Sequence, residues 1–153
     1  MLDSCFSHGV EAATVLAMTT QDNRRLLAAI FAALAEGDSG PLTDAMSENF
    51  RWRFAGEWSW VRDWGDTKQE VRKNLLRPLM AQFADYRSRA EEIIADGDRV
   101  VVRATAEATT TRGDAYPQAY CFVFRVQNGR LADVLEYCDT ALVERVLTLP
   151  TAG

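Results

Sequence analysis

The segment QNGRLADVLEYCDTALVERVL, residues 127–147, combines a turn signal, an apolar strand pattern and a helix pattern. Asn128 and Gly129 mark the turn, and the strand carries a lone carboxylate, Glu136, between Leu135 and Tyr137. Neighbours along a strand point to opposite faces of a sheet. Glu136 therefore points either into water or into the space that the sheet encloses, and this choice decides whether the protein has a site.

Further strands precede this segment. Alternating residues predict strands over 86–95, 99–111 and 116–126, which join 131–138 in a run of antiparallel neighbours. A closing helix is predicted over 139–147. Asp139, where the strand ends, is expected to be the N-cap of that helix rather than a catalytic group.

The first half of the chain is predicted to be mostly helical. Apolar residues at helical spacing predict a helix over 20–36, and a proline-initiated short helix is expected over 41–47. A third helix starts at a capping box made by Thr67 and Glu70, and Pro78 is expected to kink it.

A strand pattern, FRWRFAG at 50–56, and an irregular aromatic loop, GEWSWVRDWGD at 56–66, separate the second and third helices. Helices followed by a run of strands predict an α+β fold in which helices pack on one face of a curved sheet. A sheet that wraps around helices leaves a pocket.

Charge and composition exclude several classes of function. The formal net charge of -5, without a cluster of Lys and Arg, argues against nucleic acid or an anionic membrane as a partner. No stretch approaches the roughly 20 apolar residues of a membrane helix. The only histidine, His8, lies near the start, so histidine-based catalysis and histidine-ligated metals have no candidate in the folded part. Neither a metal nor a cofactor is expected.

The chain is expected to hold one domain, residues 20–149, after a flexible leader, residues 1–19, with Met18 as an alternative start. The three scattered cysteines form no C-x-x-C pair and no disulfide scaffold, which favours a reducing cytoplasm.

Five segments carry a resemblance to a known group of proteins: LLAAIFAALAEGD at 26–38, FRWRFAG at 50–56, DGDRVVV at 96–102, YPQAYCFVFRVQNGRL at 116–131 and EYCDTALV at 136–143. The chain resembles the SnoaL-like polyketide cyclases and ketosteroid isomerase-related families of the nuclear transport factor 2-like superfamily. The resemblance implies a cone-shaped, cystatin-like α+β barrel, with a curved mixed or antiparallel sheet around three N-terminal helices and a deep apolar cavity. This scaffold hosts isomerases, cyclases, hydrolases, dehydratases and binding proteins.

Most of the functional residues of these families have no equivalent in this sequence. The three polar groups of ketosteroid isomerases fall on Phe54, on or near Ile30, and on Phe122, so that mechanism is not expected. The resemblance to limonene epoxide hydrolases, which use two aspartates and an arginine, places the acids on Glu136 and Glu107. Their arginine position is Thr105 here, and Arg103 lies one alternation away on the same face. The catalytic candidates are therefore Glu136, Glu107 and Arg103.

The turn at 127–129 decides where Glu136 points. A two-residue turn sets Cys121 opposite Glu136, whereas a three-residue turn with a glycine bulge sets Tyr120 opposite Glu136 and Phe122 opposite Val134. The face shared by Tyr116, Gln118, Tyr120, Phe122 and Phe124 is too aromatic to leave in water and is assigned to the cavity. The family resemblance favours the three-residue turn, which points Glu136 inward. The alternative is an outward Glu136 paired with Arg125.

Glu107 and Arg103 have their own alternative. They share the polar face of their strand, opposite a small apolar face made by Val100, Val102, Ala104, Ala106 and Ala108, and such alternation usually puts the polar face outward. Cys138 is interpreted as a small hydrophobe rather than a nucleophile, since no basic partner is evident. The expected ligand-binding residues are Trp52, Phe54, Trp58, Trp60, Tyr116, Tyr120, Phe122, Phe124, Val134 and Cys138.

These features predict a protein that binds a hydrophobic small molecule and forms a homodimer through the outer sheet face. The functional hypothesis is a cofactor-free acid-base enzyme of the polyketide cyclase, isomerase or epoxide hydrolase type. In it Glu136 acts as acid or base, and Tyr120 donates a hydrogen bond. The alternative is a non-catalytic ligand-binding or dimeric assembly module of the same fold.

Overall fold

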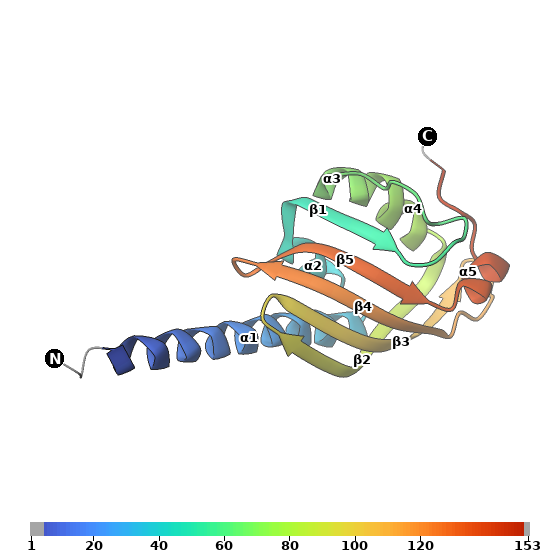
Figure 1. Cartoon of the computed structure of the whole chain (residues 1–153). Coiled ribbons are helices and arrows are strands. Elements are labelled where there is room, and N and C mark those ends of the chain that lie inside the picture. The colour runs from blue at the N-terminus through green and yellow to red at the C-terminus, as the bar shows by residue number, and fades with distance from the viewer. Residues whose placement is uncertain (1–4, 152–153) are drawn as a thin grey trace.

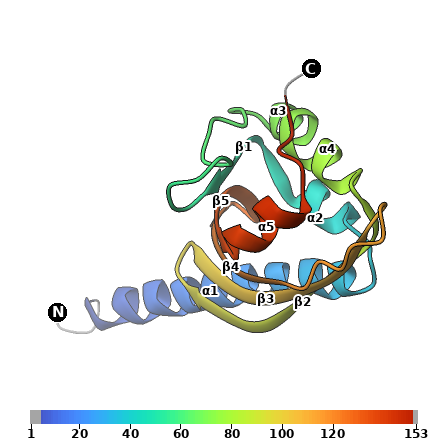
Figure 2. The same ribbon diagram turned by 90° about the vertical axis from the view of Figure 1, so that its right-hand side faces the viewer.

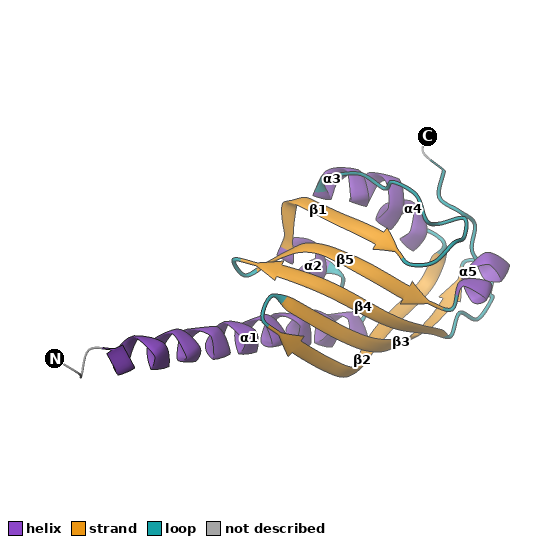
Figure 3. Ribbon diagram, viewed as in Figure 1, coloured by secondary structure: helices purple, strands orange, loops and turns teal. Residues whose placement is uncertain are grey.

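The computed structural model describes residues 5–151, with side chains from Thr19 onward. Within them five strands form one mixed sheet in the order β1-β5-β4-β3-β2, where β1 is parallel to β5 and all other neighbours are antiparallel (Figures 1 and 3). The predicted α+β class is therefore confirmed. In chain order the elements are α1 (Cys5–Ala35), α2 (Gly40–Ala45), β1 (Met46–Phe54), α3 (Lys68–Val71), a π-helical turn (Arg72–Leu76), α4 (Arg77–Met80), β2 (Phe83–Asp96), β3 (Arg99–Thr110), β4 (Gln118–Gln127), β5 (Arg130–Cys138) and α5 (Thr140–Val146).

Helix α1 packs its C-terminal half on the sheet. Of the five residues predicted for its apolar face, Leu26 is partly buried and the other four are buried, and each buried one contributes roughly 1.5–3 kcal/mol through removal of its side chain from water. The Asn23 side chain also donates to the Gly97 carbonyl at 3.0 Å, which ties α1 to the turn between β2 and β3. The buried residues on this face are Leu27, Ile30, Phe31 and Leu34.

The N-terminal part of α1 differs from the expected leader. The helix begins at Cys5 rather than near Thr20, so residues 5–19 continue it, and Figure 1 shows this part extending beyond the sheet. Residues 1–4 of the expected leader lie outside the described residues.

The turn between β4 and β5 corrects the predicted register. Asn128 and Gly129 have φ values of 52° and 74°, and Gln127 pairs with Arg130, so this is a two-residue turn and not the three-residue one. A bulge follows, because Val126 pairs with Leu131 but Arg125 pairs with Asp133. The extra residue, Ala132, shifts the pairing by one.

The bulge determines the face of Glu136. A two-residue turn alone would have set Cys121 opposite Glu136, on the outer face. With the extra residue, Phe122 lies opposite Glu136 and Phe124 opposite Val134, so all four share the inner face. Glu136 therefore points inward through a different register from the predicted one.

The helix predicted to be kinked at Pro78 contains a π-helical turn at Arg72–Leu76, after which α4 starts with Pro78 in its first turn. A proline there removes no needed hydrogen bond, so the π turn takes the place of a simple kink. The predicted capping box before α3 is present: Thr67 Oγ1 accepts from the Glu70 N–H at 3.2 Å and Glu70 Oε2 accepts from the Thr67 N–H at 3.1 Å.

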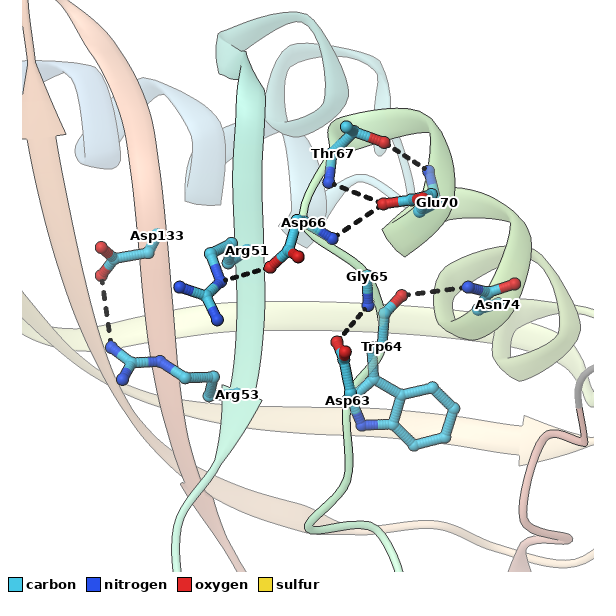
Figure 4. A network of polar contacts seen from close by, with 10 residues as sticks. All are labelled: Arg51, Arg53, Asp63, Trp64, Gly65, Asp66, Thr67, Glu70, Asn74 and Asp133. Atoms are coloured by element: carbon cyan, nitrogen blue, oxygen red, sulfur yellow. Dashed lines mark hydrogen bonds and ion pairs between the residues drawn. The ribbon is translucent and has the colours of Figure 1, made fainter.

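The aromatic loop before α3 is fixed by polar contacts (Figure 4). Asp66 pairs with Arg51 of β1 at 3.1 Å, and the Asn74 side chain donates to the Trp64 carbonyl at 3.2 Å. The loop thereby holds Trp60 and Trp64, both buried, against Phe54 at the end of β1.

Candidate functional site

A pocket of about 140 Å³ lies between the inner sheet face and the helices that cover it. Small side chains on β3, Ala104, Ala106 and Ala108, are all buried on the inner face and leave space above the middle of the sheet. Figure 2 shows the curvature of the sheet, with α5 near the end where β5 finishes. An apolar cavity of about 150 Å³ is known to hold a benzene molecule, so the pocket has the size for a small flat ligand. Its helical lining includes Phe31, Leu34, Leu76, Leu79, Met80 and Val143, and Leu147 lines it directly after α5.

Glu136 lines this pocket from β5, between Phe54 of β1 and Phe122 of β4. Its side chain is buried, its carboxyl forms no ion pair with a described residue, and its polar neighbour is the indole N–H of Trp52. Loss of hydration raises the pKa of Glu136 to about 8, because burial disfavours the charged form. The indole N–H of Trp52 lies close enough to hold that pKa down in part, although its nitrogen has no partner at hydrogen-bond distance.

The outward alternative for Glu136 is wrong. Arg125, its proposed partner, instead pairs with Asp133 at 2.8 Å on the outer face of the sheet. The bulge at Ala132 places Asp133 outside and Glu136 inside, three residues later in the chain.

Tyrosine hydroxyls supply further polar groups of the pocket. The Tyr86 hydroxyl donates to the Tyr120 hydroxyl at 2.9 Å, so this pair keeps one further O–H hydrogen. The Tyr116 hydroxyl accepts from the Gln118 side chain at 3.0 Å. Burial raises the pKa of all three tyrosines, and the charge of Glu136 adds to that rise. They remain neutral hydrogen-bond donors over the physiological range.

The other two catalytic candidates lie elsewhere, which corrects the prediction that grouped them with Glu136. Arg103 is exposed and pairs with Glu92 of β2 at 3.4 Å on the outer face. Glu107 is also exposed, opposite Arg87 of β2, beside an open groove on that face. The alternation of β3 places both outside, because its small apolar residues take the inner face.

Most of the expected ligand-binding residues line the pocket, and two do not. Trp58 stacks on Trp60 at 5.9 Å and donates its indole N–H to the Ala55 carbonyl at 2.9 Å, outside the pocket lining. Val134 is fully buried in the core beside it. The residues in the lining are Trp52, Phe54, Trp60, Tyr116, Tyr120, Phe122, Phe124 and Cys138.

Sequence reasoning missed the contribution of β2. Its edge strand places Phe83, Tyr86 and Ser88 in the lining. The available signal was the alternation of Tyr86, Ser88 and Ala90 with Arg87 and Arg89, which puts the arginines outside.

Cys138 is the last residue of β5, and Asp139 follows it directly. Burial raises the pKa of Cys138 to about 12, with the charges of Glu136 and Asp139 adding to the rise, so the side chain is a neutral thiol. Asp139 accepts from the Leu142 N–H at 3.2 Å, which confirms its predicted N-cap position. Within residues 5–151 no helix is long and apolar enough to cross a membrane, and no cluster of three His, Cys, Asp or Glu suits a metal ion.

Solved structures share this fold. An NTF2-like protein of unknown function from Burkholderia pseudomallei K96243 is 23% identical over 83% of this chain and 98% of its own, with a TM-score of 0.69. A protein provisionally described as a SnoaL-like polyketide cyclase, from Jannaschia sp. CCS1, is 15% identical over 87% of this chain and 96% of its own, with a TM-score of 0.68. TerC, crystallised with polyporic acid, is 18% identical over 82% of this chain and 97% of its own, with a TM-score of 0.66.

At these identities the likeness shows the fold alone. No curated protein sequence matches the chain significantly. The model of the SnoaL-like domain matches residues 27–134, which include α2, the aromatic loop, β1 to β4 and the first part of β5. The predicted resemblance to SnoaL-like proteins is confirmed: the chain has the fold of NTF2-like proteins and belongs to the SnoaL-like domain family.

Proposed function

We propose that the protein binds a flat, apolar carbonyl compound and catalyses proton transfer at the carbon next to the carbonyl, without a cofactor. The observation that supports this most directly is the buried carboxyl of Glu136, which has no ion-pair partner among the described residues and opens into an aromatic pocket. A carboxyl with a pKa of about 8 is a stronger base when ionised than an ordinary glutamate. The co-crystal of TerC with polyporic acid gives a precedent for a small-molecule ligand in this fold.

The proposed step uses two groups of the pocket. The ionised carboxylate of Glu136 takes a proton from the substrate carbon, the C–H bond breaks, and its electron pair moves into the carbonyl group to give an enolate. The enolate oxygen accepts a hydrogen bond from Tyr120, whose pair with Tyr86 retains one O–H to donate. Return of the proton from Glu136 to another atom of the enolate completes an isomerisation. Alternatively, attack by the enolate carbon on a second carbonyl breaks its C=O π bond and closes a ring, and the resulting alkoxide takes the proton from Glu136.

The ketosteroid isomerase mechanism is a poor fit. The three positions that would carry its polar groups hold Ile30, Phe54 and Phe122, and all three side chains are buried and apolar. The acid-base chemistry therefore depends on Glu136 from β5.

Exchange of α-hydrogens tests the proposal without knowledge of the natural substrate. The wild-type protein is expected to accelerate hydrogen-deuterium exchange of 2-tetralone in D₂O, followed by ¹H NMR. Glu136→Gln should lower that rate by about 10²- to 10⁴-fold, the usual contribution of a general base, while calorimetry shows that the ketone still binds. The rate should rise about tenfold per pH unit and level off near pH 8, where Glu136 is ionised.

Glu107→Gln is the matched control, since it makes the same change on the outer face and should leave the rate unchanged. Exchange that survives in Glu136→Gln would contradict the role of this carboxyl. Saturable binding with no acceleration by the wild type would instead support the alternative of a non-catalytic binding module.

We also propose a homodimer that forms through the outer sheet face in a reducing compartment such as the cytoplasm. An apolar row crosses this face, because Ile94, Val101, Val123 and Leu135 are successive partners on neighbouring strands. Ile94 is 55% exposed, and Cys121 and Cys138 are free thiols. Sedimentation equilibrium should give twice the chain mass, and Ile94→Asp should give the monomer mass. A monomer at high micromolar concentration of the wild type would contradict the dimer.

A further inference from the structure

Two side-chain atoms in the described part of the chain are fully buried without a hydrogen-bond partner: Trp52 Nε1 and Ser88 Oγ. Both residues line the pocket, and Ser88 is only 2% exposed. An unsatisfied buried polar atom lowers the stability of a protein, so native proteins rarely keep one unless something else bonds to it. Both atoms being in the pocket wall points to a ligand as the missing partner.

The two atoms belong to different parts of the pocket. Trp52 is on β1, beside Glu136, and so belongs to the reactive group already described. Ser88 is on β2, at the other edge of the sheet, and the proposed proton transfer makes no use of it.

The surroundings of Ser88 leave its hydroxyl free to meet a ligand. Its cross-strand neighbour is Ala106, a side chain too small to cover it. Tyr86 points to the same face two residues earlier, and Ser88 lies near enough to lower the pKa of Tyr86 in part, although Ser88 Oγ has no partner at hydrogen-bond distance. Three hydroxyls, those of Ser88, Tyr86 and Tyr120, thus belong to one side of a mostly apolar pocket.

We propose that Ser88 Oγ forms a second subsite that binds a hydroxyl or carbonyl oxygen of the ligand, separate from the carbonyl held by Tyr120. The inference rests on the proposed function and narrows its substrate class to flat carbonyl compounds that carry a second oxygen. A ligand hydroxyl suits the site well, because a serine hydroxyl both donates and accepts and a hydroxyl partner matches either role.

A pair of ligands that differ in one group tests the subsite. In 3-hydroxyacetophenone and 3-methylacetophenone the same ketone carries either a hydroxyl or a methyl of similar size. The wild type should bind the hydroxyl compound more tightly by calorimetry, and Ser88→Ala should reduce that preference about tenfold, the size of one buried hydrogen bond. The ligand-free Ser88→Ala protein should melt no lower than the wild type, because it loses an unsatisfied hydroxyl. Ser88→Cys, which keeps a side chain of similar size, is the second variant.

Ser39→Ala is the matched control. Ser39 lies at the edge of the pocket, but it is exposed, so water can satisfy its hydroxyl, and the preference should stay unchanged. An unchanged preference in Ser88→Ala, an equal loss for both compounds, or no preference in the wild type would overturn the subsite and leave the proposed function standing. Failure of the wild type to bind either compound would contradict both.

Discussion

Glutamine in place of Glu136 is expected to make the protein more stable at pH 8.5, by several kcal/mol, and no more stable near pH 4.5. The folded-state pKa of about 8 lies above the ordinary value of 4.5, so the folded protein holds this proton more tightly than the unfolded chain. Between these two pH values the unfolded chain has released the proton and the folded protein has not. The stability of the wild type therefore falls as pH rises through this window.

The size of the effect follows from the same shift. Each pKa unit corresponds to about 1.36 kcal/mol, so the full shift corresponds to about 5 kcal/mol, a large share of the 5–15 kcal/mol typical of a domain. Glutamine has no proton to lose, so the free energy of unfolding of the Glu136→Gln variant lacks the pH-dependent part that Glu136 contributes. The difference in free energy of unfolding between variant and wild type should grow from pH 4.5 to pH 8 and then stay constant.

Urea unfolding followed by tryptophan fluorescence measures this difference, and Trp60 and Trp64 are buried reporters. Subtraction of the two curves cancels all the carboxyls that both proteins share. Glu107→Gln is the control, because its exposed carboxyl should give a difference near zero at every pH. A flat difference for Glu136→Gln would mean that this carboxyl is hydrated in the folded protein.

The inner faces of the strands follow from the sequence where alternation is unbroken. On β3 the small apolar residues alternate strictly with polar ones, so the inward position of Val100, Val102 and Ala104 needs no further information. That same pattern argued against an inward Glu107 and Arg103. Only the resemblance to another enzyme suggested them, and the physical pattern was the better guide.

The register of β5 could not be read from alternation, because one residue breaks it. Leu131 and Val134 are both fully buried although they lie three apart, and Asp133 between them reaches the outer face to pair with Arg125. A bulge is the simplest way to satisfy both requirements. The pairing of Asp133 with an arginine on the next strand was the signal available in the sequence.

The β2 side of the pocket was missed for a different reason. From the sequence, a polar residue on an inner face, such as Ser88, is predicted to be exposed when its partner is a ligand and not another side chain. Its flanking arginines, Arg87 and Arg89, have exposed side chains on the opposite face. A rule that assigns only apolar residues to the inner face of a strand therefore misses residues that bind a ligand in this way.

Replacement of Gln118 by methionine is expected to lower the free energy of unfolding by about 4 kcal/mol, because a buried amide with four bonds is lost. Gln118 is 2% exposed, and its Oε1 accepts from the N–H groups of Asp139 and Ala119 at 2.8 and 2.9 Å. Its Nε2 donates to the Asp139 carbonyl at 3.1 Å and to the Tyr116 hydroxyl at 3.0 Å. Methionine has a similar size but can form none of these hydrogen bonds. The groups that bonded to Gln118 are therefore left without a partner, while no large cavity forms.

The loss should also reach the pocket, since Gln118 holds the residue that caps α5, and Val143 of α5 and the following Leu147 form part of the lining. Gln82→Met is the matched control. Gln82 clamps the backbone of Thr148 with two bonds of 2.8 Å, but these are exposed to solvent, so water replaces them at a cost below about 1 kcal/mol. Urea unfolding of both variants gives the comparison. Equal losses of unfolding free energy would show that burial of the Gln118 amide adds nothing. A larger loss for Gln118→Met, together with weaker binding of the ketone, would show that the same buried amide supports both the fold and the wall of the pocket.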